Sequence, residues 1–193
     1  MGRKKLLKRC VWVGVSPEMV AYHDTEWGLP VRDDNQLFEF LTLEGAQAGL
    51  SWATILKRRS GYRKNFLNFN PKEVALLKKP DVERILKDKG VIRNRLKVES
   101  VITNARCVLE LKKEFGSFEK FIWSFVGGRV IKNTFKYLSE IPAETDKSLA
   151  MSKELKKRGF KFVGSTIAYA FMQAVGMVND HTTDCFRYNK CGS

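Results

Sequence analysis

A glutamate on an apolar helical stripe is the residue of this sequence with the clearest chemical potential. Glu44 follows Leu41 by three residues and precedes Ala48 by four, so its carboxylate shares a helix face with apolar side chains. An inward carboxylate is costly to desolvate unless it is paired. Trp52 follows a run of small residues, which lets a flat molecule come close. This pattern suits a flat, electron-poor or cationic ligand; alternatively, Glu44 pairs with an internal Arg, Lys or backbone amide.

The two histidines of the chain each have a cysteine nearby. Cys10 and His23 are separated by twelve residues, and His181 and Cys185 by three, so the second pair shares one face of a helical turn. Two thiolates and two imidazoles complete a tetrahedral zinc shell with no open position, which is typical of a structural site. The spacing therefore predicts one structural Zn²⁺ that fastens the N-terminal segment to the C-terminal one. The alternative is two unrelated pairs, with packed histidines and inert thiols.

Residues 82–97 form a third pattern: an apolar helix, a glycine turn at Gly90 and a basic helix. The first amides of the second helix have no internal partner, and its dipole places positive charge there. With Arg93, Arg95 and Lys97 nearby, this end is a candidate cradle for a backbone phosphate of DNA. The alternative is an ordinary helical hairpin with a solvated basic face.

Composition favours a polyanionic partner. The 193 residues include 35 Lys and Arg against 21 Asp and Glu, a net charge of +14. A field of this sign points first to nucleic acid and second to an anionic membrane surface. No apolar run reaches the length of a membrane span, so no membrane-spanning segment is expected. Four cysteines do not indicate a disulfide scaffold, and a cytoplasmic protein with reduced thiols is expected.

The elements that must position these residues are predicted to be helices. Cap residues and Pro at helix starts, and Gly at helix ends, recur along the chain, and no two-residue alternation indicates a strand. The prediction is an all-α chain with about eight or nine helices and an irregular segment at 129–144. Residues 163–175 are apolar nearly all round and should form a central buried helix. A basic arm at 1–9 is expected to precede one domain at 10–193, with the hairpin at about 80–115.

Together these motifs resemble one family, the 3-methyladenine DNA glycosylase I family of alkylation-repair enzymes. The resemblance runs from about residue 10 to residue 185. It is carried by Cys10-Val11-Trp12, by 21–28 (AYHDTEWG), by 43–52 (LEGAQAGLSW), by 91–95 (VIRNR), by 155–164 (LKKRGFKFVG) and by 179–185 (NDHTTDC). The family belongs to the helix-hairpin-helix superfamily of DNA glycosylases, although its hairpin is atypical and the usual catalytic aspartate after the hairpin is absent.

The resemblance implies hydrolysis of the N-glycosidic bond of 3-methyladenine in double-stranded DNA, without strand cleavage, by a monomer. The nucleotide must be flipped out of the duplex, and Leu50 is the candidate wedge for the gap. The zinc ligands match the Cys and His residues named above. The residues matched to the base pocket are Glu44, Tyr22 and Trp52, with Trp12 and Trp27 close by.

Glu44 is the residue expected at the reaction centre. We expect it to anchor the base by accepting hydrogen bonds from the amino edge; the contrasting role is a general base that activates water. Two other functions share most of these features. One is a non-catalytic, zinc-clipped sensor of alkylated DNA bases, and the other is a cytosolic enzyme that acts on a small aromatic cation.

Overall fold

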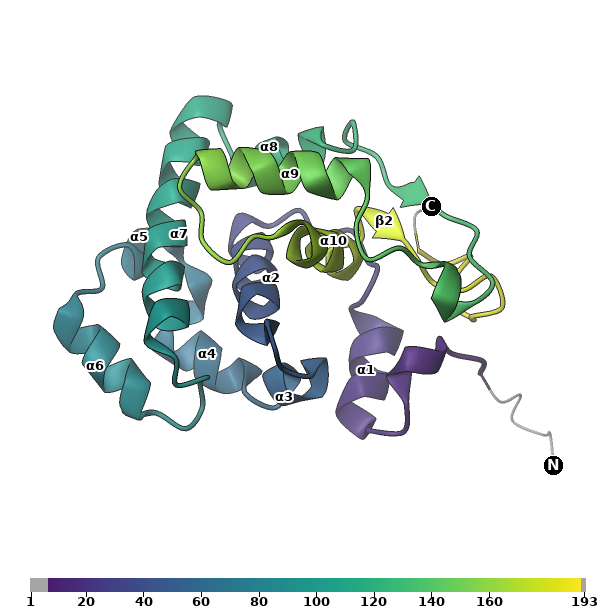
Figure 1. The fold of residues 1–193 in the computed structure, drawn as a ribbon, viewed down its shortest axis with the longest axis horizontal. Helices are drawn as coiled ribbons and strands as arrows, with labels where there is room; N and C mark the ends of the chain where they lie inside the picture. Colours follow the sequence, from purple (N-terminus) through teal and green to yellow (C-terminus); the bar gives the residue numbers. More distant parts are fainter. Residues whose placement is uncertain (1–6, 192–193) are drawn as a thin grey trace.

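The computed structural model describes residues 7–191, and helices dominate this range (Figure 1). None of these helices is long and apolar enough to cross a membrane. The predicted helical class is confirmed, with one α-helix more than expected in the described part, because α4 begins without a side-chain cap that the sequence could reveal. The α-helices are α1 (Pro17–Thr25), α2 (Asp34–Gln47), α3 (Trp52–Leu56), α4 (Arg59–Asn65), α5 (Pro71–Val74), α6 (Lys79–Lys87), α7 (Arg95–Phe115), α8 (Phe118–Ser124), α9 (Asp146–Lys157) and α10 (Ser165–Ala174). The 3-10 helices are η1 (Val11–Val13), η2 (Leu67–Phe69) and η3 (Leu138–Glu140).

Two segments predicted to contain no strand pair with each other. β1 (Ile131–Lys132) lies parallel to β2 (Val178–Asn179), with Ile131 opposite Val178. The prediction of a purely α chain with an irregular 129–144 segment is therefore wrong at this point. A strand of two residues is too short to show alternation. It forms because the tertiary fold brings two distant segments together.

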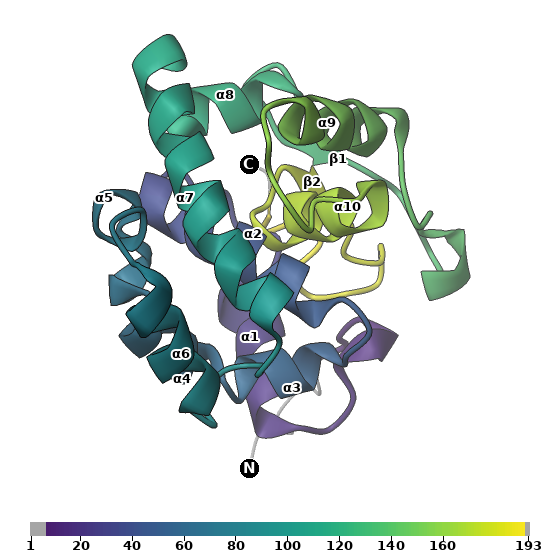
Figure 2. The ribbon, with the colours of Figure 1, turned by 60° about the vertical axis from the view of Figure 1, so that its left-hand side comes forward.

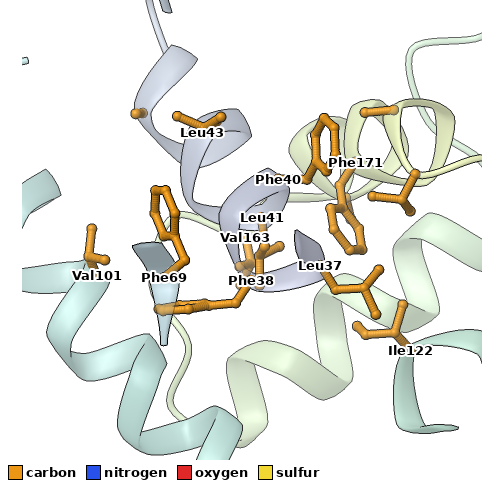
Figure 3. Packing of buried hydrophobic residues seen from close by; sticks show 14 of the residues in the cluster. Leu37, Phe38, Phe40, Leu41, Leu43, Phe69, Val101, Ile122, Val163 and Phe171 are labelled. Atoms are coloured by element: carbon orange, nitrogen blue, oxygen red, sulfur yellow. The ribbon is translucent and has the colours of Figure 1, made fainter. Parts of the chain in front are cut away.

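Helix α2 runs through the centre of the molecule and carries the inward glutamate (Figure 1). Its first turn is capped by Asp33, whose side chain accepts a hydrogen bond from the backbone N–H of Gln36 at 2.9 Å. Leu37 is fully buried, and Figure 3 shows it beside Phe171 of α10 and Ile122 of α8. Because α2 packs against neighbours on several sides, it is a rigid support for the residues that it carries.

The hairpin of α6 and α7 is joined by a tight loop at residues 88–94. The side chain of Asp88 accepts hydrogen bonds from the backbone N–H of Gly90 at 2.7 Å and from Asn65 Nδ2 at 2.9 Å. A Cβ at Gly61 would lie 2.2 Å from the carbonyl oxygen of Gly90, so this approach requires glycine. The loop is thereby held against α4.

The two ends of the described chain lie together. The backbone N–H of Phe186 donates to the carbonyl oxygen of Lys8 at 2.9 Å, and the guanidinium of Arg9 bonds both carboxylate oxygens of Asp24. Lys8 and Arg9 are therefore attached to the domain, although they were predicted to belong to a basic arm. Residues 1–6 of that arm lie outside the described residues.

Candidate active site and metal cluster

A cavity of about 330 Å³ lies between the N-terminal helices and α10. The residues predicted for the base pocket all line it: Trp12, Tyr22, Trp27, Glu44 and Trp52. They come from η1, α1 and the turn after it, α2 and α3. The volume lies within the range of small-ligand pockets, about 300–1,000 Å³. The fold thus brings together at one cavity five residues spread over forty positions of the sequence.

Glu44 is buried in the wall of this cavity, with 5% of its surface exposed. No residue of the described chain forms a hydrogen bond or ion pair with its carboxyl group, and burial alone raises the pKa of Glu44 to about 8. Within the described residues, Glu44 therefore does not pair with an internal Arg, Lys or backbone amide, which was the alternative interpretation of its position. Burial, together with the nearby charge of Glu44, also raises the pKa of Tyr22 well above its ordinary value, so Tyr22 stays a neutral hydroxyl.

Aromatic rings form the walls around this carboxyl group. The rings of Tyr22 and Trp52 lie 5.3 Å apart, and those of Trp12 and Trp27 meet edge to face at 4.8 Å. The Nε1–H of Trp52 is buried and has no hydrogen-bond partner within residues 7–191. The unpaired polar group that the cavity wall offers to a ligand is therefore the carboxyl group of Glu44, whereas the Nε1–H of Trp52 is shielded from solvent. Unpaired buried polar groups are uncommon in folded proteins, and a bound ligand is one way to satisfy them.

Cys10, His23, His181 and Cys185 form a buried cluster that could hold a metal ion. Their candidate ligand atoms all lie within 4.8 Å of one another. Nε2 of His23 is 3.5 Å from Sγ of Cys185, and Nδ1 of His181 is 3.6 Å from both sulfur atoms. Hydrogen bonds from Cys10 and from the two histidines hold the pKa of Cys185 well below that of a free thiol. The predicted pairing of the two ends of the chain is therefore realised in the fold.

Each histidine of the cluster is oriented through its outer nitrogen. Nδ1 of His23 lies 2.8 Å from Oδ1 of Asp24, and Nε2 of His181 lies 3.3 Å from the carbonyl oxygen of Trp27. Partners of this kind fix the tautomer and turn the other nitrogen toward a metal. Both inner nitrogens consequently face the thiols.

Two tryptophans separate the cavity from the cluster. The ring of Trp12 lies 5.4 Å from that of His23, and the ring of Trp27 lies 4.6 Å from that of His181. Both tryptophans also line the cavity. The cluster therefore supports one wall of the cavity directly.

A second hollow, of about 470 Å³, lies between Leu50 and the hairpin loop. Leu50 is 40% exposed in the turn after α2, as a wedge would need to be. Arg93 lines the same hollow, together with Arg58 and Lys89, which the sequence reasoning did not single out. Helix α7 begins at Arg95, two residues later than predicted, so Arg93 belongs to the loop. Three cationic side chains thus line the same hollow as the proposed wedge.

The other two cations predicted to contact phosphate already have protein partners. Arg95 forms ion pairs with Glu83 and Glu99. Lys97 donates hydrogen bonds to the backbone carbonyls of Ala46 and Ala48. Arg95 and Lys97 were expected to be free to contact phosphate, but the sequence alone does not show which charged side chains already have protein partners.

Comparison with known proteins decides the family. The sequence profile described as methyladenine glycosylase matches residues 12–188. The chain belongs to this family. It is 50% identical to DNA-3-methyladenine glycosylase 1 of Escherichia coli (strain K12) over 182 residues, which are 94% of this chain and 97% of that relative. It is 47% identical to DNA-3-methyladenine glycosylase of Haemophilus influenzae, over 92% of this chain and 96% of that one.

Solved structures of methyladenine glycosylases have the same fold. A crystal structure of 3-methyladenine DNA glycosylase I has a TM-score of 0.91 and 51% identity, covering 93% of this chain and 98% of its own. The enzyme from Staphylococcus aureus, described in terms of 3-methyladenine recognition, has a TM-score of 0.91 and 34% identity, with 94% and 97% coverage.

In this methyladenine glycosylase, one wall of the cavity consists of residues that the sequence did not identify as part of a site. It consists of the segment 138–143 and polar side chains of α10. The Tyr169 hydroxyl and Gln173 Nε2 donate to Asp180 at 2.6 and 2.7 Å, and Asn133 donates to the same carboxylate at 2.7 Å. The four-residue spacing of Tyr169 and Gln173 was the available signal, but it lies within a segment that is apolar nearly all round.

Proposed function

We propose that this chain removes 3-methyladenine from alkylated double-stranded DNA by hydrolysing the N-glycosidic bond, without cutting the strand. The observation that carries the proposal is Glu44, a buried carboxyl group without a protein partner in an aromatic-walled cavity. The names of the relatives, which match almost the full chain, support the same activity. All the residues involved come from one chain, so a monomer is sufficient.

Hydrolysis of this N-glycosidic bond requires little acid catalysis from the protein. The lesion is cationic, so its base leaves as a neutral molecule: water forms a bond to C1′ of the sugar, the N-glycosidic bond breaks, and a proton is released to solvent. An ionised Glu44 accepts hydrogen bonds from the amino edge of the base and complements the charge of the lesion. The ring of Trp52 provides an aromatic face, which attracts a cationic base more than a neutral one.

The nucleotide reaches the cavity by leaving the duplex. Leu50 enters the gap in the base stack, and the cations of the loop hold the phosphates next to it. In this proposal the α6–α7 hairpin is the helix-hairpin-helix element of the superfamily. Arg93 is the cation of the predicted set that is exposed and has no ion-pair partner within residues 7–191.

The metal of the cluster is zinc in this proposal. Two thiols and two imidazoles are its usual structural ligands, and the N···S distances of 3.5–3.6 Å are close to those between ligands of a tetrahedral zinc, about 3.5 Å. Bound there, zinc supplies stability only, because four protein ligands leave no position for substrate or water.

Release of free base tests the proposed function. Purified protein is incubated with N-methylated duplex DNA, and the soluble fraction is analysed by chromatography. We expect 3-methyladenine to be released and the strand to remain intact. Tight binding of alkylated DNA without any release would favour the non-catalytic sensor instead.

Arg93→Ala is expected to weaken DNA binding equally for all sequences. A phosphate contact carries no base information, and its loss should lower the slope of log K against log salt by about one. Binding is measured on two unrelated duplexes at several salt concentrations. Lys113→Ala, at the distant end of α7, is the matched control and should leave the slope unchanged. A changed sequence preference with an unchanged slope would show that Arg93 does not contact phosphate.

The rate of excision is expected to rise with pH and to level off above about 8. The pKa of Glu44 lies above its ordinary value, so the carboxyl group of the empty cavity is neutral below about 8 and ionised above it. The cationic lesion binds the ionised form better, and kcat/KM reports the free enzyme. Single-turnover excision is measured from pH 6 to 9 at constant ionic strength, with enzyme concentrations well below saturation so that the rate reports kcat/KM. The ratio of wild type to Glu44→Gln removes effects shared by both proteins; a ratio that falls with pH contradicts the assignment.

A further inference from the structure

Lys97 extends from one helix to the end of another. It is the third residue of α7, yet its Nζ donates to the carbonyl oxygens of Ala46 at 2.8 Å and Ala48 at 2.7 Å. These residues lie in the last turn and at the C-cap of α2. Hydrogen bonds from a charged donor are among the stronger ones in proteins. Helices α7 and α2 lie next to each other (Figure 2). The hydrogen bonds of Lys97 therefore link the hairpin directly to the helix that carries Glu44.

The electrostatics of the two helices explain this placement. A cation in the first turn of its own helix opposes the helix dipole, whereas a cation at a helix C-terminus stabilises it. Lys97 is unfavourably placed for α7 and favourably placed for α2. Burial lowers the pKa of Lys97. Its ammonium group nevertheless lies within hydrogen-bond distance of both carbonyl oxygens. The interaction with α2 is thus the one that accounts for a lysine at this position.

The end of α2 leads immediately to the proposed wedge. Gly49 follows with a φ of +77°, and the N–H of Leu50 donates to the carbonyl oxygen of Gln47 at 2.6 Å. Within residues 7–191, Lys97 is the one residue whose side chain donates hydrogen bonds to the backbone of residues 46–50. The turn that carries Leu50 is therefore attached to the hairpin through this ammonium group.

We propose that Lys97 is a positioning residue that holds the Leu50 turn at a fixed place relative to the DNA-binding hairpin. When the hairpin grips the phosphates, the wedge must resist the stacked bases that it separates. The hydrogen bonds of Lys97 then keep the Leu50 turn attached to α7 while Leu50 is pressed against the bases. The inference rests on the proposed glycosylase function, and it concerns flipping of the nucleotide rather than recognition of the free base.

The test compares substrates that do and do not require flipping. Base release by Lys97→Met is measured in single turnovers on methylated duplex and on the same DNA as a single strand, with titration of free 3-methyladenine alongside. We expect excision from duplex to fall by about tenfold or more, excision from single strands by less than threefold, and affinity for the free base to stay unchanged. Lys97→Arg, which can donate to both carbonyls, should recover most of the duplex rate.

Salt dependence separates this role from a phosphate contact. Lys97→Met should keep the wild-type slope of log K against log salt, whereas Arg93→Ala lowers it by about one. Equal loss on duplex and single strand, or a reduced salt slope, would overturn the inference. If Lys97→Met unfolds at the assay temperature, Lys97→Gln replaces it, with the same expected order of effects. Absence of base release by the wild type would overturn the proposed function instead.

Discussion

Replacing His181 with alanine is expected to abolish binding of the proposed zinc and to lower the midpoint of thermal unfolding by about 6–20 °C. The cluster joins residues 171 positions apart, and its loss leaves buried thiols without their partner. Breaking a buried charged interaction costs about 3–5 kcal/mol. For a chain of this size each kcal/mol corresponds to about 2–4 °C. Metal analysis and calorimetry on the same preparations measure both quantities.

The same variant should keep most of its intrinsic excision rate. Four protein ligands leave the metal no open position for chemistry, so its loss acts through stability and through the tryptophan wall. Assayed well below its unfolding midpoint, His181→Ala should excise within about threefold of the wild type. Cys107→Ala, which removes a half-buried thiol outside the cluster, serves as the control and should retain the metal. Chelator-washed wild-type protein that contains no zinc and unfolds at the same midpoint would refute the assignment.

At pH 9, where the carboxyl group of Glu44 is ionised, Glu44→Gln is expected to weaken binding of free 3-methyladenine by about 1–3 kcal/mol, or about 5- to 150-fold. The amide keeps the size and one acceptor of the carboxylate but loses its charge, in a cavity where no described residue replaces it. Excision should slow without being abolished, because the glycosidic bond of the cationic lesion is already weak. Trp52→Ala should also reduce affinity, through loss of stacking.

Two measurements on Glu44→Gln separate an anchor from a general base. A titration with free base reports binding, and a single-turnover assay reports the chemical step. If Glu44 activates water, the variant should bind the base normally and be almost inactive. That combination would show that our role for Glu44 is mistaken. Weaker binding with residual excision supports the anchor.

The sequence predicted the parts of the site whose spacing follows one helix or one ligand set. Glu44 and its aromatic neighbours lie in short, continuous motifs, and the Cys/His cluster has a composition that is hard to explain otherwise. The opposite wall at 138–143 could not be predicted. Its position depends on the β1–β2 pair and on the hydrogen bonds of Asp180, and neither leaves a periodic signal in the sequence.

Charge is the property that the sequence reasoning judged least well. Arg93, Arg95 and Lys97 are alternate or near neighbours, and spacing alone gave them one role. In the fold, Arg95 is neutralised by Glu83, twelve residues earlier, and Lys97 binds backbone some fifty residues away. Such partners are set by tertiary contacts, so the number of free cations on a surface can be counted only in the structure.

Because the Cys/His cluster joins distant parts of the chain, it can be completed only late in synthesis of the protein. His181 is synthesised 171 residues after Cys10. At about 5–20 residues per second, translation needs on the order of 10–30 s to cover that distance. Throughout this interval Cys10 and His23 form only half of a ligand set, and the tryptophan wall lacks its support. The complete ligand set therefore comes together only when translation nears completion, and until then the Cys10 thiol lacks His181 and Cys185, two of the four side chains that form the site in the folded protein.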